Sequence, residues 1–321
     1  MRIDILTLFP DAVDAMMHAS ILGRAQERGY ITIRTHQIRS FTTNKQMQVD
    51  DYPYGGGRGA VMQADPLYRC WQHICDEAGE RVHTIYMSPC GRVLTQQVAR
   101  ELKAQYDRLI LVCGHYEGVD QRFLDECVDE EISMGDFVLT GGEIPAMALA
   151  DCLCRMVPGV LPEESCYTDE SHWNGLLEYP QYSRPEEWHG RKVPEVLLSG
   201  HHGNVADWRT RESYKRTMAR RPDMWARFDL TRVHSRHDKK VLAQALETEA
   251  FYIGMIGSSS KKASVYRALR AQGVSDAALA RVCCPIGLGI GADTPQQIAV
   301  SVVAELMAAR AGTLGALRAA R

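Results

Sequence analysis

Short apolar runs that alternate with helix-like segments constrain the fold of this chain more than any other feature. The helix-like segments include 11–28 and 95–106, whose apolar residues have the spacing of one helix face. Strands that alternate with helices favour a largely parallel sheet. We therefore predict an α/β domain over residues 1–160, with strands in the runs IDILTLF (3–9), YITIRTHQI (30–38), VHTIYMS (82–88), RLILVCG (108–114) and FVLTGG (137–142).

Glycines follow or bracket three of the predicted strands, in YMSPCG (86–91), CGHYEG (113–118) and MGDFVLTGG (134–142). Ligands of open α/β sheets gather beyond the carboxyl ends of the strands, where bare backbone allows a close approach. We expect the three loops to form one pocket, with Phe137–Leu139 as a buried strand between its glycines. Each loop taken singly is equally consistent with a tight turn. None has the spacing of the common nucleotide-binding motifs.

A fourth glycine-rich loop, DYPYGGGRGAVM (51–62), surrounds Arg58 and also contains Tyr52 and Tyr54. Flexible backbone beside an arginine and aromatic rings can contact a sugar-phosphate chain or stack on a base. A mobile surface loop has the same composition, so the residues alone leave both interpretations open.

The composition excludes several classes of protein. With 45% hydrophobic and 24% charged residues among 321, the chain is typical of a globular protein of two or three domains. No apolar window approaches the roughly 18 residues of a membrane helix, and the start MRIDILTLFP lacks the features of a signal peptide. We expect a cytoplasmic protein without a membrane partner. The ten cysteines match neither a disulfide framework nor a zinc site, so we expect reduced thiols and no metal ligands.

Two further regions differ from residues 1–160 in periodicity and in charge. Residues 158–185 lose periodicity and read as a linker or a long functional loop. The helical segment 204–222 is locally positive although the chain carries a net charge of −3. A solvated helix face is the alternative to a phosphate-binding surface there. Its basic residues are Arg209, Arg211, Lys215, Arg216, Arg220 and Arg221, against Asp207 and Glu212.

Beyond about residue 232 the pattern becomes strand, glycine turn and helix, with Gly273 as a helix stop. A second helix is predicted to open in DTPQQIAVSVVAELMAAR, with Thr294 as N-cap, Pro295 at its first position and Gln297 completing a capping box.

Seven segments together resemble the bacterial tRNA (guanine-N1)-methyltransferase family, over residues 1 to about 231. They are LFP, DDYPYGGGRGAVM, LILVCGHYEGVDQR, EISMGDFVLTGGEIPAMALAD, VPGVL, GLLEYPQYSRP and VPEVLLSGHH. The resemblance implies methylation of the guanosine at position 37 of tRNA, 3′ to the anticodon, by a SPOUT-class homodimer whose parallel sheet contains a deep trefoil knot. It divides this part into a knotted domain (1–160), a linker (161–185) and a small helical tRNA-binding domain (186–232).

The resemblance also implies S-adenosylmethionine as methyl donor, held mainly by backbone groups. Gly141 and Gly142 would give the knot room to turn; glycines that serve only the crossing are a compatible alternative. The residues implied to bind the cofactor are Tyr86, Met87, Ser88, Gly114, Ser133, Met134, Gly135, Phe137, Val138, Leu139, Gly141, Gly142 and Pro145.

The chemistry needs a carboxylate to accept the proton of guanine N1 and a positive partner for the charge that gathers on O6. Arg155 is similar in position to the family arginine that faces O6; a pair with Asp151, four residues back, is the structural alternative. The family base is an aspartate, whereas this chain reads CYTDESHW. Counting from Arg155 places Glu170 there, with Asp169 adjacent, so we name both and favour Glu170.

Two departures from the family pattern concern the RNA. Arg58 stands where proline is common and His115 where arginine is common. With Arg209, Lys215 and Arg216 of the basic helix, both are predicted to contact tRNA, mainly by charge. Mg²⁺ is a further expectation of the resemblance, although no compact set of carboxylates identifies a site.

Residues from about His234 to Gly312 resemble a different family, the XdhC/CoxF accessory proteins of molybdenum-enzyme maturation. That family has a Rossmann-like domain, and the glycine-rich first half that should precede this segment is missing. We expect residues 233–321 to be a partial Rossmann-like α/β fragment, joined by gene fusion or by an error in the sequence. Its open strand edges predict a poorly packed or partner-seeking appendage. The tail raises one alternative function, a nucleotide-binding accessory protein; a second is a tRNA-binding protein in which the change from aspartate to Glu170 impairs catalysis.

Overall fold

The structure is a computed structural model that describes residues 1–228, 245–257, 259–271 and 273–319. These residues form two compact units. The first contains residues 1–193 and 209–227, and the second contains residues 194–208 with the described residues from 228 onward. Each unit is built around its own sheet, so each is described separately below.

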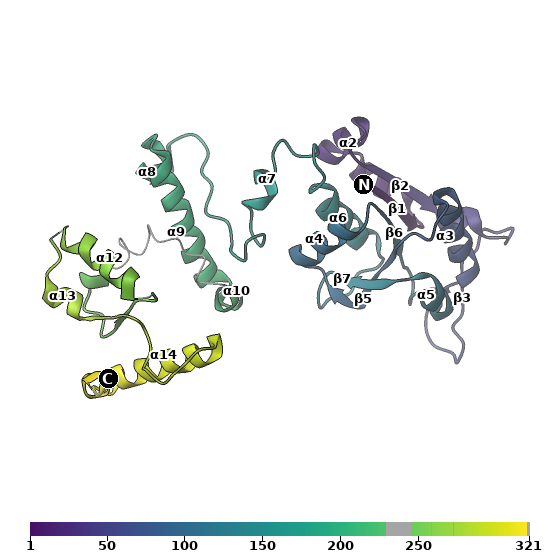
Figure 1. Cartoon of the computed structure of the whole chain (residues 1–321). Helices are drawn as coiled ribbons and strands as arrows, with labels where there is room; N and C mark the ends of the chain where they lie inside the picture. The colour runs from purple at the N-terminus through teal and green to yellow at the C-terminus, as the bar shows by residue number, and fades with distance from the viewer. Residues whose placement is uncertain (229–244, 258, 272, 320–321) are drawn as a thin grey trace. The chain divides into compact units, whose positions relative to one another are not determined.

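A five-stranded parallel sheet forms the centre of the first unit, in the order β2-β1-β6-β5-β7 (Figure 1). This confirms the predicted α/β class, and four of the five predicted runs coincide with strands to within a few residues. The strands are β1 (Arg2–Thr7), β2 (Thr32–Gln37), β5 (Thr84–Val93), β6 (Arg108–Cys113) and β7 (Glu130–Ser133).

The fifth predicted strand, which included Phe137–Leu139, is wrong. These residues have no strand structure and are exposed, whereas β7 is the preceding stretch Glu130–Ser133. Because β7 lies at the edge of the sheet, it tolerates two glutamates and lacks the apolar run of an inner strand. An apolar triplet in a loop at a cavity has the same composition as a short buried strand.

Helices cover both faces of the sheet and create two apolar cores. Ile3 and Ile5 of β1 point into one core and Leu6 into the other, as the alternation of a strand requires. The first core contains residues of α1 (Pro10–Met17), α2 (Ser20–Glu27), α4 (Gln96–Gln105) and α6 (Glu143–Cys154), and the second contains residues of η1 (Ile38–Phe41), α3 (Ala64–Ala78) and α5 (Gln121–Cys127). The predicted helix 11–28 is thus two helices that bury apolar residues in one core.

Smaller elements complete the first unit and the chain up to residue 227. They are the pair β3 (Asp50–Asp51) and β4 (Val61–Met62), α7 (Ser165–Thr168), the hairpin β8 (Glu187–Trp188) and β9 (Arg191–Lys192), α8 (Glu195–Leu198), α9 (His202–Arg220) and α10 (Pro222–Arg227). The predicted basic helix 204–222 is confirmed as α9 and the start of α10. The predicted linker is ordered by contacts: Trp173 packs against Tyr167 and lies under Arg100, and Leu177 N donates to Thr217 Oγ1 of α9.

The carboxyl-terminal part has a much smaller sheet, the parallel pair β10 (Ile253–Gly254) and β11 (Val282–Cys283). Its helices are α12 (Ser259–Arg270), α13 (Asp276–Ala280), α14 (Pro295–Arg310) and α15 (Leu314–Ala319). The predicted start of α14 is confirmed, because Thr294 is its N-cap, Pro295 is at its first position and Gln297 closes a capping box. No helix in the described ranges is long and apolar enough to cross a membrane.

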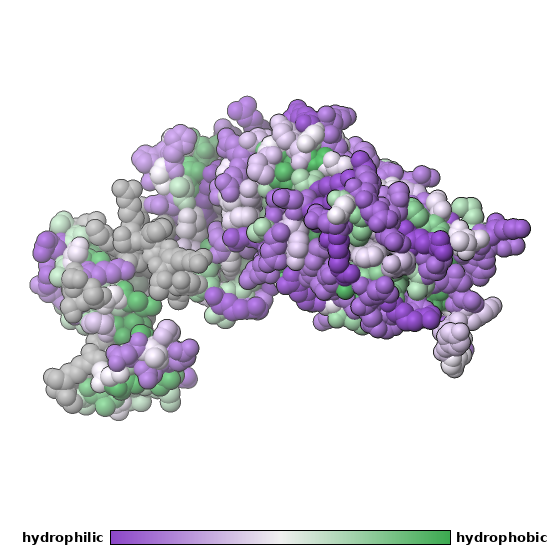
Figure 2. Space-filling model, turned by 45° about the vertical axis from the view of Figure 1, so that its right-hand side comes forward, coloured by the Kyte–Doolittle hydropathy of each residue, from purple (hydrophilic) through white to green (hydrophobic). Residues whose placement is uncertain are grey.

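The helix α14 has an inverted burial pattern. It buries Ser301 and Glu305, and Glu305 accepts a hydrogen bond from the hydroxyl of Tyr252. Val303 and Met307 of the same helix are 55% and 68% exposed. Figure 2 shows hydrophobic residues on the surface of the carboxyl-terminal part, whereas the visible face of the sheet domain is mainly hydrophilic.

Candidate active site

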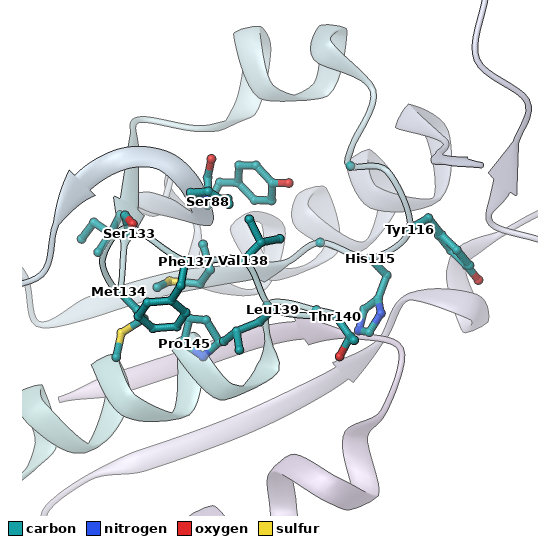
Figure 3. A pocket seen from close by; sticks show the side chains of 18 of the residues that line it. Ser88, His115, Tyr116, Ser133, Met134, Phe137, Val138, Leu139, Thr140 and Pro145 are labelled. Carbon is teal, nitrogen blue, oxygen red and sulfur yellow. The ribbon is translucent and has the colours of Figure 1, made fainter. Parts of the chain in front are cut away.

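A cavity of about 160 Å³ lies at the carboxyl ends of the neighbouring strands β6, β5 and β7. Its wall is formed by residues Tyr86–Pro89 within β5, by the loops after β6 and β7 and by the start of α6 (Figure 3). Parallel sheets bind ligands at this edge. All of the predicted cofactor residues except Gly135 line it, namely Tyr86, Met87, Ser88, Gly114, Ser133, Met134, Phe137, Val138, Leu139, Gly141, Gly142 and Pro145.

The first wall exists because β5 is interrupted. Met87 and Arg92 both pair with Ile132 of β7, so the four residues Ser88–Gly91 bulge out of the ladder. A side chain at Gly91 is impossible without a shift, because its Cβ would lie 2.3 Å from the carbonyl carbon of Glu131. The glycine therefore lets the chain return to β7 after the bulge, and the bulge supplies Ser88 and Pro89 to the cavity.

The second wall is the irregular segment that the sequence had suggested as a strand. Gly135 does not line the cavity but shapes this segment: its φ is +134°, its N–H donates to Ser133 Oγ, and its carbonyl oxygen accepts from Phe137 N at 2.8 Å. Val138 is 79% exposed. The apolar side chains thus stand at the rim of the cavity instead of in the sheet.

The third wall follows β6 and includes His115, which lies beside Thr140 in Figure 3. His115 Nε2 is 2.6 Å from Glu143 Oε2 in α6, and its ring packs edge-on to Phe9 at 5.0 Å between centroids. Its side chain is only 16% exposed. His115 was predicted to contact tRNA; the structure locates it in the cavity wall, engaged with a buried carboxylate.

Further residues line the cavity that the resemblance had not assigned to the cofactor. They are Pro89, Tyr116, Glu117, Gly118, Ile132 and Thr140. All but Ile132, which lies two residues before the third motif, are within one of the glycine-bearing motifs, so these motifs indicated most of the lining. Glu143 directly follows the third motif, but its contacts with Thr7 and His115 are made only by the fold.

The two predicted catalytic groups, Arg155 and Glu170, form a bidentate ion pair. Arg155 Nη1 donates to Glu170 Oε2 at 2.6 Å and Nη2 donates to Oε1 at 3.0 Å. This hydrogen bonding raises the pKa of the Arg155 guanidinium. The carboxylate of the alternative partner, Asp151, makes no ion pair with Arg155; the two residues share only the backbone hydrogen bond of the helix, from Arg155 N to Asp151 O. The exposed Asp169 directly precedes Glu170 as the C-cap of α7.

Within one chain, the ion pair and the cavity are separated by the length of α6. The helix begins beside the cavity at Gly142 and Glu143 and ends at Cys154, with Arg155 as its C-cap. At 1.5 Å per residue the twelve residues of this helix span about 18 Å. The predicted base and the predicted cofactor site therefore lie at opposite ends of one helix.

Besides His115 in the cavity wall, the predicted RNA contacts fall in two places. Arg58 is exposed in the loop between β3 and β4, where Tyr52 and Tyr54 are 86% and 100% exposed. The remaining predicted contacts are on α9 and already have intramolecular partners: Arg209 lies over the ring of Tyr179, Lys215 pairs with Glu212, and Arg216 donates to Glu178 O. Over the described ranges, no group of three or more His, Cys, Asp or Glu side chains could hold a metal ion.

Comparison with known proteins agrees with these features. Residues 1–227 match the family described as tRNA (Guanine-1)-methyltransferase TrmD, and residues 198–306 match the XdhC Rossmann domain. The second match starts earlier than the predicted His234 and overlaps the first.

Similar curated relatives carry the name tRNA (guanine-N(1)-)-methyltransferase. The relative from Ruminiclostridium cellulolyticum is 52% identical over 225 residues, which are 70% of this chain and 96% of the relative. The one from Chloroflexus aurantiacus is 51% identical over 245 residues, 76% of this chain and 96% of the relative. The chain belongs to the tRNA (guanine-1)-methyltransferase family.

Proposed function

We propose that this protein transfers the methyl group of S-adenosylmethionine to N1 of the guanosine at position 37 of tRNA, in the cytoplasm. The observation that carries the proposal is the cavity at the ends of β6, β5 and β7, lined by all but one of the residues that family resemblance assigned to the cofactor. Family membership over residues 1–227 supports the same conclusion.

The lining of the cavity fits an adenosine. Ile132, Leu139 and Pro145 offer apolar contacts to a base, while the glycine turns offer backbone N–H and C=O groups. When bound, S-adenosylmethionine supplies a methyl group activated on a sulfonium. The backbone of Tyr86 to Ser88 and of Ser133 to Leu139 would hold it.

The residues of the ion pair have complementary tasks in the proposed reaction. Glu170 accepts the proton of guanine N1 as the methyl arrives, and Arg155 stabilises the negative charge on O6. In the free protein each neutralises the other. Binding of guanine would therefore exchange a contact between Arg155 and Glu170 for contacts of each with the base.

We also propose that the active unit is a knotted homodimer. The separation of about 18 Å along α6 supports a second subunit, because a partner's ion pair can approach a cavity that the chain's own pair does not reach. Support for the knot comes from family membership and from the close crossing at which Gly142 N donates to Gly114 O.

The helix α9 and the exposed loop 51–62 are the proposed tRNA contacts. Arg209, Lys215 and Arg216 would exchange intramolecular partners for phosphates, and Tyr52 and Tyr54 would stack on bases. Mg²⁺ is expected to assist, as in the sequence-based prediction, but no described residue is assigned to it.

The test is methyl transfer from labelled S-adenosylmethionine to tRNA transcripts that carry G or A at position 37. Label on the G37 transcript alone is the expected result. Binding of both transcripts without label would instead indicate a tRNA-binding protein that has lost catalysis. The accessory-protein alternative, which is not favoured by the relatives, predicts no binding of tRNA.

A further inference from the structure

A buried chain of polar side chains stands behind the glycine turn of the cavity. Thr7 Oγ1 donates to Glu143 Oε1 at 2.7 Å, and His115 Nε2 bonds to Glu143 Oε2 at 2.6 Å. Thr7 is fully buried and Glu143 is 8% exposed. The hydroxyl of Thr7 is itself fixed, because it accepts from Phe9 N at 2.9 Å. The three groups come from β1, from the loop after β6 and from α6.

The side chains of His115 and Glu143 pack directly against the backbone of Gly141. A Cβ at that glycine would lie 2.3 Å from His115 Cε1 and 2.7 Å from Glu143 Oε2. His115 and Gly141 also form a backbone bridge, and the next residue, Gly142, donates to Gly114 O at 2.9 Å. The imidazole and the carboxylate therefore fill the space behind Gly141, while the backbone of Cys113 and Gly114 lies behind Gly142.

His115 is the side chain that pairs with Glu143 Oε2. Among the described residues, no lysine or arginine makes an ion pair with this carboxylate. The other titratable groups nearby are the thiol of Cys113 on β6, whose pKa is raised by burial, and Tyr116 and Glu117 on the loop of His115. From β1 and the segment after it, Thr7 and Phe9 contribute no charge.

We propose that His115 and Glu143 are positioning residues that hold the Gly141–Gly142 turn for the cofactor, and that this hold weakens when His115 loses its proton. The inference rests on the proposed function, because it takes S-adenosylmethionine as the ligand. An imidazole changes charge between about pH 5 and 8. A neutral imidazole can still donate a hydrogen bond to the carboxylate, but the coulombic attraction of the ion pair is lost, and a wall that is ordered before binding increases affinity.

The experiment measures the dissociation constants of S-adenosylmethionine and S-adenosylhomocysteine by calorimetry from pH 5.5 to 8.5. The proteins are the full chain, His115→Arg with a fixed positive charge and His115→Gln with none. Relative to His115→Arg, the unmodified protein should lose affinity by about three- to tenfold across this range. His115→Gln should bind weakly at every pH. Dividing each dissociation constant by that of His115→Arg at the same pH cancels the effect of the ligand's own amino group, which also titrates.

The second ligand separates positioning from direct charge effects. S-adenosylhomocysteine lacks the sulfonium, so an equal loss with both ligands supports a mechanical hold on the turn. Glu143→Gln should remove the pH dependence as His115→Gln does, and far-ultraviolet circular dichroism checks that each variant is folded. If the dissociation constants of the unmodified protein and of His115→Arg change in parallel with pH, the inference is wrong but the proposed function is unaffected. Absence of binding at every pH would overturn the proposed function as well.

Discussion

The inner strands of the sheet domain and the helix α14 bury different kinds of side chain, although the carboxyl-terminal part also has a small apolar core around Ile253 and Leu269. In the sheet domain, Ile5 and Leu111 are fully buried between helices on both faces. In the carboxyl-terminal part, α14 buries Ser301 and Glu305 and exposes Val303 and Met307. A five-stranded sheet offers two faces for apolar helices, whereas a pair of two-residue strands offers too little surface to cover a helix of 16 residues. Apolar content alone does not make a core; the facing surface has to exist.

The largest effect should come from the proposed base, which lies in the first region. Glu170→Gln keeps the shape of the side chain and a hydrogen bond to Arg155 but cannot accept the N1 proton, so methyl transfer should slow by about 10²- to 10⁴-fold. Single-turnover assays with excess enzyme measure this step. Glu163→Gln, an exposed change on the same segment, is the matched control. A normal rate in Glu170→Gln together with a collapse in Asp169→Asn would transfer the role to Asp169.

A second prediction compares one apolar truncation in each region. Leu111→Ala should destabilise the sheet domain by about 2–5 kcal/mol, because it leaves a cavity between strands and helices. Val303→Ala should change stability by less than about 0.5 kcal/mol, because more than half of the valine already contacts solvent. Denaturant unfolding of both variants measures the free energy. Equal losses would mean that the exposed face of α14 is covered in solution.

A third prediction concerns the buried carboxylate of Asp4 in β1. Burial raises its pKa, but hydrogen bonds from His36 and Arg2 outweigh burial and lower the pKa below its ordinary value of 3.8. A carboxyl whose folded pKa is depressed stabilises the fold above the unfolded pKa and loses that contribution as pH falls through the folded pKa. The free energy of unfolding should therefore decline below about pH 4.

Asp4→Asn should remove this part of the pH dependence. At pH 7 it should cost about 3 kcal/mol, the lower end for a broken buried ion pair, since Arg2 also keeps its partner Glu77. Urea unfolding of both proteins between pH 3 and 7 gives the comparison. An unchanged acid limb in Asp4→Asn would assign the decline to other groups.

Local features were predictable from the sequence, and features made by the fold were not. The start of α14 was readable because a capping box involves only Thr294 and Gln297, three residues apart. The inner strands were readable because both faces of each are buried and the apolar run is continuous. Phe137–Leu139 was misread because an apolar triplet at a cavity rim carries the same letters as a strand.

The polar side chains behind the cavity show most clearly what the sequence could not predict. Thr7 and Glu143 are 136 residues apart, and no periodicity connects them. In the sequence, His115 was noticed only as a departure from the family motif, and it was therefore predicted to contact RNA. The motif gave no information about its contact with Glu143 of α6. Arg155 and Glu170 were predicted as catalytic groups from the family resemblance, whereas their distance from the cavity follows from the length of α6 and could be seen only in the structure.

The smallest effect should follow from removing the carboxyl-terminal part altogether. The relatives named tRNA (guanine-N(1)-)-methyltransferase match this chain over nearly their whole length without it; the match to the Ruminiclostridium cellulolyticum protein covers 96% of that relative. Both apolar cores of the sheet domain, the cavity and the ion pair use residues before 228. A chain that ends at residue 228 should therefore keep kcat/KM for G37 tRNA within about twofold, since no transition-state contact is lost. A loss of tenfold or more in kcat/KM would show that the tail takes part in binding tRNA or in holding the active unit together. An equal loss of affinity for tRNA, without loss of kcat, would indicate a role in binding tRNA.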